Sequence, residues 1–191
     1  MTGPAGGEVR VRQVLPHRYP MLLVDRVVEL VPERSVTALK AVSGNEPWYG
    51  ELPDCPDGPD GSDGMVDDYP AVLLLESWCQ SAAVLGTVGE PEPDVLAGRV
   101  PLLGGVSAVS FPGRVRPGDV LVHRVDLVRR LADTMIFAGT SAVGAVTVMT
   151  VGSVVLALRP AAGLPAAAAP ADATGAADGG RSGRPERTVR R

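Results

Sequence analysis

The chain has 191 residues, of which 45% are hydrophobic and only 4% aromatic, so it can bury one core built mainly from Val, Leu and Ala in a single domain. Its net charge of −4 is uneven, because residues 1–159 carry 13 basic and 19 acidic side chains while residues 160–191 carry five arginines and three acids. An acidic body argues against nucleic acid as the main partner.

Neither export nor membrane insertion is indicated by the sequence. The N-terminus lacks a charged region followed by an apolar one, and no apolar run reaches about 18 residues. We therefore expect a soluble cytoplasmic protein. The two cysteines, Cys55 and Cys79, are too few for a disulfide framework and lack the spacing of zinc ligands, and no metal or cofactor is expected. Cys79 lies in an apolar stretch and is expected to be buried.

The N-terminal part of the chain predicts a pair of strands. Residues 1–7 are small and Gly-rich and are expected to be disordered, and the domain is expected to begin at residue 8. The segments Met21–Val31 and Ser35–Ser43 are rich in β-branched and aliphatic residues, and a Pro-Glu-Arg break separates them. This pattern is typical of two paired strands joined by a turn.

Residues 50–68 consist largely of Gly, Pro and Asp, a composition that predicts a loop without a core of its own. Asp57, Asp60 and Asp63 could indicate calcium, but an EF-hand loop places its ligands at every second residue and ends in a bidentate Glu. The spacing therefore favours a flexible acidic loop over a metal site.

The stretch from Asp67 to Leu85 predicts a helix that is apolar on nearly all sides, which is typical of a helix inside a protein. Pro70 suits its first position, and Gly86 is the expected stop. Glu76 and Gln80 lie one turn apart on the same face. Glu76 either belongs to a narrow solvated stripe with Ser77, Gln80 and Ser81, or points into a cleft, where burial makes a carboxyl group a proton donor near neutral pH.

After a polar connection over Gly89–Pro101, four further strands are expected, over Gly105–Phe111, Asp119–Leu131, Thr134–Val143 and Ala145–Leu158. Residues 160–191 are expected to be a disordered tail. One helix wrapped by a curved antiparallel sheet satisfies this order, which predicts a single α+β domain of the hotdog type over residues 8–159. The open edge of such a sheet predicts a dimer.

Four blocks of sequence resemble the bacterial 3-hydroxyacyl-[acyl-carrier-protein] dehydratases of the FabZ/FabA type. They occur in the family's order between residues 8 and 158: Leu15–Arg26, Asn45–Tyr49, Tyr69–Glu76 with Gln80, and Phe111 through Val115–Asp119. The resemblance implies elimination of water from a 3-hydroxyacyl thioester carried by the phosphopantetheine arm of an acyl carrier protein. In that family a histidine takes the C2 proton and a helix carboxylic acid protonates the C3 hydroxyl, with the two groups contributed by different subunits.

On this resemblance Glu76 matches the acid, Gln80 the residue that orients it, and Ala71 the position whose N–H faces the thioester oxygen. The chain departs from the pattern where the family has Gly-His-Phe-Pro, because Glu51 stands at the position of the histidine. Ala71 replaces the usual glycine, and the acidic loop is longer than in the family. His17 matches a family position outside the active site, and His123 lies in a predicted strand, so both are expected to be structural.

Three hypotheses follow. The first is a subunit that is not self-sufficient and pairs with a catalytic homologue, to which it contributes Glu76 or only a docking surface for the carrier protein. The second is a homodimeric dehydratase or isomerase in which Glu51 and Glu76 are the catalytic pair. The third is a non-catalytic acyl-binding or scaffold protein. Abundant Ala, Gly and Arg with a single Lys indicate a GC-rich bacterial genome, which makes a polyketide or polyene pathway plausible beside fatty acid biosynthesis.

Overall fold

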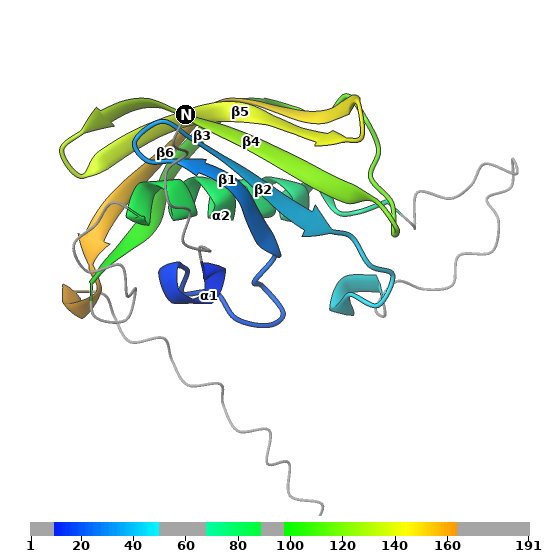
Figure 1. Cartoon of the computed structure of the whole chain (residues 1–191), viewed down its shortest axis with the longest axis horizontal. Helices are drawn as coiled ribbons and strands as arrows, with labels where there is room; N and C mark the ends of the chain where they lie inside the picture. The colour runs from blue at the N-terminus through cyan, green and yellow to red at the C-terminus, as the bar shows by residue number, and fades with distance from the viewer. Residues whose placement is uncertain (1–9, 50–67, 89–97, 164–191) are drawn as a thin grey trace, which may run out of the picture.

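The computed structural model describes residues 10–49, 68–88 and 98–163, which form a sheet, a long helix and several short helical turns (Figure 1). The strands are β1 (Arg26–Val31), β2 (Ser35–Ala41), β3 (Arg99–Ser110), β4 (Val120–Leu131), β5 (Thr134–Val143) and β6 (Val146–Pro160). The helices are α1 (Val11–Val14) and α2 (Ala71–Thr87), with short 3-10 turns η1 (Pro47–Tyr49) and η3 (Ala161–Gly163). No helix in these three ranges is long and apolar enough to cross a membrane.

The strands form an antiparallel sheet in the order β1-β2-β4-β5-β6-β3. Tight turns join β1 to β2, β4 to β5 and β5 to β6, and each turn contains a residue with positive φ, namely Glu33 at 57°, Ala132 at 49° and Gly144 at 55°. This left-handed conformation lets the chain reverse sharply. Strand β3 instead follows α2 and pairs with β6, so that β1 and β3 are the two edges of the sheet.

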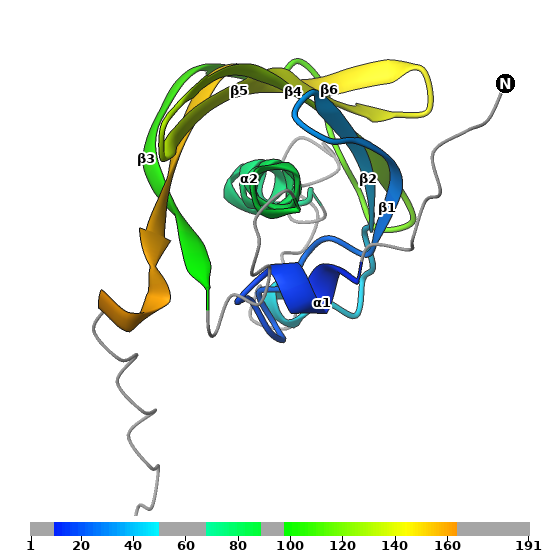
Figure 2. The same cartoon turned by 60° about the vertical axis from the view of Figure 1, so that its left-hand side comes forward.

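Helix α2 lies in the concave face of the sheet, which curves around it (Figure 2). Every residue from Ser77 to Thr87 is buried, and Trp78 is fully enclosed. Because the sheet covers the helix on several sides, this part of α2 has no solvated face, which explains why its sequence is apolar all round. The predicted α+β architecture, one long helix wrapped by a curved antiparallel sheet, is confirmed.

Both predicted ends of the long helix need correction. Pro70 is the residue before the helix, with a ψ of 126°, and the first helical residue is Ala71. The helix also continues past Gly86 to Thr87. A Cβ atom at Gly86 would lie 2.7 Å from the Met135 Cε, so a larger residue here would have to displace the end of the flexible Met135 side chain on β5. Cys79 on this helix is buried, as predicted.

Two strand predictions also need correction. The segment from Met21 to Asp25 is not a strand, because the Gln80 side chain on α2 occupies the backbone carbonyl of Met21 and the N–H of Leu23. Strand β3 begins at Arg99 and not at Gly105, so it includes part of the expected polar connection. A bulge between Leu103 and Gly105 lets the pairing with β6 continue on both sides of the glycines.

Helix α1 was not predicted, because four residues are too few for a helical pattern. Strand β6 ends at Pro160, one residue beyond the predicted end of the domain at residue 159, and the extent of the domain stays a prediction. The acidic segment 50–67, residues 1–7 and residues 164–191 lie outside the described part, so their predicted disorder stays a prediction.

A buried polar cluster ties α2 to the sheet. His123 on β4 is fully buried, and its Nε2 lies 2.9 Å from the Ser77 Oγ while its Nδ1 lies 2.7 Å from the Ser141 Oγ. Burial, followed by the charge of Lys40, lowers the pKa of His123 from 6.5 to about 3. The ring is therefore neutral near pH 7, with both nitrogens hydrogen-bonded, in the structural role expected for it.

Acid should destabilise the fold through His123. Because its pKa is lower in the folded than in the unfolded chain, the unfolded chain binds the proton first as the pH falls below 6.5. The stabilisation is complete above pH 6.5 and is lost toward pH 3, at about 1.4 kcal/mol per pH unit. Urea unfolding at about pH 7.5 and about pH 5 measures this loss. The His123→Gln variant should lose less stability than the parent; an equal loss in both would contradict the assignment.

Gly139→Ala should also destabilise the protein. An added Cβ atom would lie 2.0 Å from the Arg124 carbonyl oxygen on the neighbouring strand, and neither backbone can move without breaking the sheet. We expect a cost of about 2 kcal/mol or more, measured as a lower thermal unfolding temperature. Gly44→Ala is the matched control, because its nearest neighbour would be the Pro117 Cβ at an ordinary 3.7 Å. Equal effects of the two substitutions would contradict this account.

Candidate active site

Glu76 lies where α2 emerges from the sheet. Ala71 and Val72 at the start of the helix are exposed, Val72 to 71%, whereas Leu74 and all residues after Glu76 on the helix are buried. The Glu76 side chain itself is 30% exposed. Glu76 does not belong to a solvated stripe, because Ser77, Gln80 and Ser81 are all fully enclosed.

Gln80 holds this carboxyl group in place. Its Nε2 donates hydrogen bonds to the Glu76 Oε1 at 2.9 Å and to the Met21 carbonyl at 2.7 Å. Its Oε1 accepts a hydrogen bond from the Leu23 N–H at 2.9 Å. The amide is 1% exposed and has all three partners, so its orientation is fixed by the loop as well as by the helix. The predicted Glu76–Gln80 pair is therefore in contact.

His17, which the family resemblance places outside the active site, lies beside Glu76 in the structure. Its Nε2 lies 3.3 Å from the Glu76 Oε1. Burial is the main cause that lowers the pKa of His17, with Arg18 acting in the same direction and Glu76 opposing it. The contact joins a loop to a helix 59 positions away, so no local spacing could have indicated it.

Ala71 is the first residue of α2, as its predicted role requires. Among the described residues no side-chain hydrogen bond caps the start of α2, and none of the first-turn residues is acidic. Asp68 forms an ion pair with Arg114, at 2.6 Å between Oδ2 and Nε. The N–H groups of Leu73 and Leu74 donate to the Pro70 carbonyl, so within the described residues the N–H groups of Ala71 and Val72 are left for another acceptor, at the positive end of the helix dipole.

Glu51, the remaining predicted site residue, lies outside the described residues, as do Asp57, Asp60 and Asp63. Within the described ranges, no group of three His, Cys, Asp or Glu side chains is arranged to hold a metal ion.

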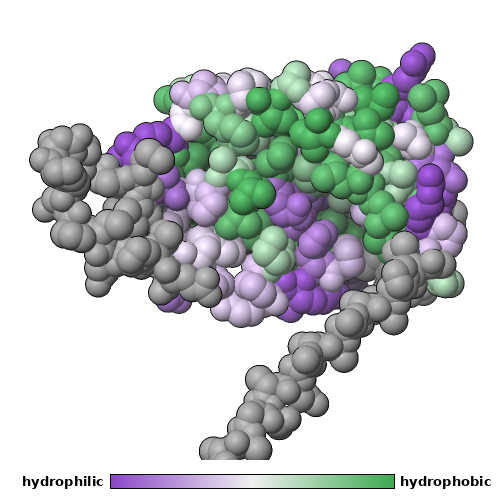
Figure 3. Space-filling view, turned by 180° about the vertical axis from the view of Figure 1, so that it is seen from behind, coloured by the Kyte–Doolittle hydropathy of each residue, from purple (hydrophilic) through white to green (hydrophobic). Residues whose placement is uncertain are grey.

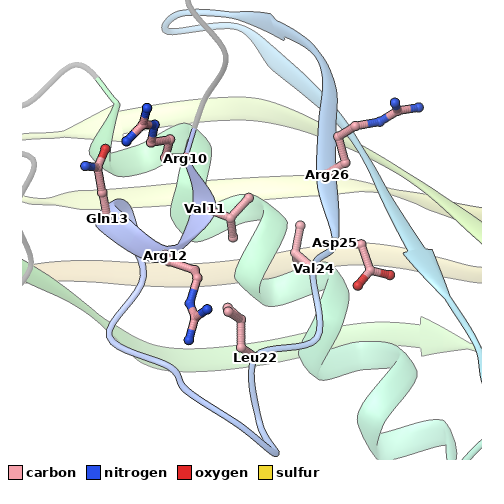
Figure 4. Close-up of a pocket in the computed structure, with 8 residues that line it drawn as sticks. All are labelled: Arg10, Val11, Arg12, Gln13, Leu22, Val24, Asp25 and Arg26. Carbon is pink, nitrogen blue, oxygen red and sulfur yellow. The ribbon is translucent and has the colours of Figure 1, made fainter.

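A cavity of about 560 Å³ lies between α1 and the segment that leads into β1 (Figure 4). Val11, Leu22 and Val24 line its apolar part, and the Arg26 side chain points away from it (Figure 4). Its lining includes neither Glu76, Gln80 nor His17. The cavity is therefore separate from the candidate active site.

Comparisons with solved structures agree with the fold. The dehydratase heterocomplex ApeI:P from Xenorhabdus doucetiae has a TM-score of 0.60 at 20% identity, over 78% of this chain and 90% of that one. A hot-dog-like protein from Thermanaerovibrio acidaminovorans has a TM-score of 0.51 at 14% identity, over 69% of this chain and 84% of the other. These likenesses show that the chain has the hotdog fold.

No protein-family model matches the chain, but curated relatives do. It is 36% identical over 140 residues to the 3-hydroxyacyl-[acyl-carrier-protein] dehydratase FabZ of Polynucleobacter asymbioticus, covering 72% of this chain and 84% of the relative. It is 37% identical to the FabZ of Ruminiclostridium cellulolyticum, covering 61% of this chain and 72% of the relative. Identity and coverage at this level show that this chain belongs to the FabZ family of 3-hydroxyacyl-[acyl-carrier-protein] dehydratases.

Proposed function

We propose that this chain is a dehydratase subunit that supplies the acid Glu76 and depends on a homologous chain for the base. The observation that carries the proposal is the ordered Glu76 carboxyl group, which Gln80 holds at the open end of α2. Family membership supports a 3-hydroxyacyl thioester on an acyl carrier protein as the substrate. Glu51 at the family's histidine position supports the dependence on a second chain.

The proposed reaction needs two groups. A base removes the proton from C2, the C2–H electrons form the C2=C3 double bond, and the C3 hydroxyl leaves as water after protonation by an acid. In this scheme Glu76 is the acid. The Ala71 N–H, at the free start of α2, polarises the thioester carbonyl and so makes the C2 proton more acidic. The base is a histidine of the homologous partner.

The β3 edge is the surface proposed for the partner. Leu102, Leu103, Val106 and Phe111 along it are between 38% and 56% exposed, and apolar side chains gather on the rear face of the molecule (Figure 3). A strand edge with free N–H and C=O groups pairs readily with a strand of another chain. The ApeI:P structure is described as a heterocomplex of dehydratases, which supports a partner of the same fold over a second copy of this chain.

The experiments described below also distinguish two alternative functions. A homodimer could use Glu51 as the base, although two carboxyl groups would then have to share one proton between them. A scaffold or acyl-binding protein would need neither glutamate. We further infer a cytoplasmic location beside the carrier protein, and fatty acid or polyketide biosynthesis as the pathway.

The purified chain should not dehydrate a 3-hydroxyacyl carrier substrate alone. With a co-encoded FabZ-like homologue it should produce the 2-enoyl product, detected by mass spectrometry as a loss of water from the carrier-bound acyl group. The homologue alone is the control. Complete turnover by this chain in the absence of any partner would contradict the proposed dependence and support the Glu51 alternative.

Replacing the acid should abolish the activity of the reconstituted complex. Glu76→Gln keeps the shape and removes the transferable proton, so kcat should fall by about 100- to 10,000-fold. Glu51→Gln should leave kcat unchanged, and Glu29→Gln, an exposed residue on β1, is the matched control for loss of a surface charge. Unchanged turnover with Glu76→Gln would support a scaffold. Loss of turnover with Glu51→Gln would support Glu51 as the base.

A further inference from the structure

Two nitrogen atoms approach the same oxygen of Glu76. The Gln80 Nε2 donates to Oε1 at 2.9 Å, and the His17 Nε2 lies 3.3 Å from that same Oε1. Within the part of the chain that the structure describes, no hydrogen bond is found for the other oxygen, Oε2, and it is not a buried atom without a partner. The two oxygens of this carboxyl group therefore have different surroundings.

The surroundings of the His17 ring favour one tautomer. Its Nδ1 is buried without a hydrogen-bond partner among the described residues, whereas its Nε2 lies 3.3 Å from Oε1. A proton on Nδ1 would leave a buried N–H donor unpaired and would direct the Nε2 lone pair at an oxygen that is itself an acceptor. A proton on Nε2 removes both problems. Burial lowers the pKa of His17, which agrees with a neutral ring at pH 7.

We propose that His17 is a positioning residue for Glu76, which donates from Nε2 to Oε1 and thereby leaves Oε2 to carry the proton given to the substrate. This inference rests on the proposed role of Glu76 as the acid. With two N–H donors on Oε1, that oxygen acts as the carbonyl oxygen of the protonated acid. The transferable proton is then on Oε2, for which no donor is found among the described residues.

The geometry assigns His17 a position behind the acid. A base and an acid must lie on either side of the C2–C3 bond of the substrate, but 3.3 Å between His17 and Glu76 leaves no space for carbon atoms between them. The neighbouring groups Arg18 and Cys79 are consistent with this role of His17. Arg18 is engaged with the carbonyls of Leu15 and His17, and burial followed by the charge of Glu76 raises the pKa of Cys79 to about 12, so that its thiol stays protonated.

Kinetics of the reconstituted complex test the role. His17→Phe removes the donor, so kcat should fall by about 10- to 100-fold with KM little changed. Glutamine places an amide N–H where the histidine has Nε2–H, so His17→Gln should restore kcat to within about threefold of the parent. The control is Tyr19→Phe, because Tyr19 lies in the same loop and is 84% exposed. A parent-like kcat in His17→Phe, or equal losses in the Phe and Gln variants, would overturn the proposal.

A spectroscopic test on the isolated full-length chain does not depend on any partner or on turnover. The chain has two histidines, so nitrogen-15 NMR resolves both rings, and His17→Gln identifies the signals of His17. We expect a neutral ring protonated on Nε2 at pH 7. A neutral ring protonated on Nδ1, or a charged ring, would overturn the inference. Failure of Glu76→Gln to affect turnover would instead refute the proposed function and leave the NMR result unaffected.

Discussion

The side-chain amide of Gln80 is the contact on which the rest of the candidate site depends. It joins three parts of the chain, because it binds the backbone at Met21 and Leu23 and also the Glu76 carboxyl group one turn earlier on α2. A buried amide with both N–H donors and its oxygen engaged is held rigidly, since breaking any of these hydrogen bonds leaves a buried polar group unpaired. Glu76 therefore has a defined position although it is partly open to solvent.

The two ends of helix α2 have different roles in the protein. Its buried C-terminal part fills the concave sheet, with Trp78 and Leu85 in the core and Ser77 bound to His123 of β4. Its first two residues, Ala71 and Val72, are by contrast exposed, and no side-chain cap is found for them among the described residues. Because both parts belong to one rigid helix, the packing that stabilises the fold also sets the height and direction of Glu76 above the sheet.

Local sequence signals were sufficient for the long helix, for most of the strands and for the Glu76–Gln80 pair, because apolar periodicity, turn residues and a spacing of four depend only on neighbouring positions. They were insufficient for the segment from Met21 to Asp25 and for His17. Aliphatic residues in that segment have the composition of a strand, but a side chain from a distant helix takes its backbone hydrogen bonds. Contacts of this kind are decided by tertiary structure and have no local pattern.

The open β3 edge also affects how much of this protein a cell can contain without aggregation. Strand β3 pairs with β6 on one side only, and among the described residues its other edge, with large apolar side chains exposed along it, is open to pairing with another chain. In the proposed heterodimer the partner would cover this edge, so any excess of this subunit over its partner would be prone to aggregation.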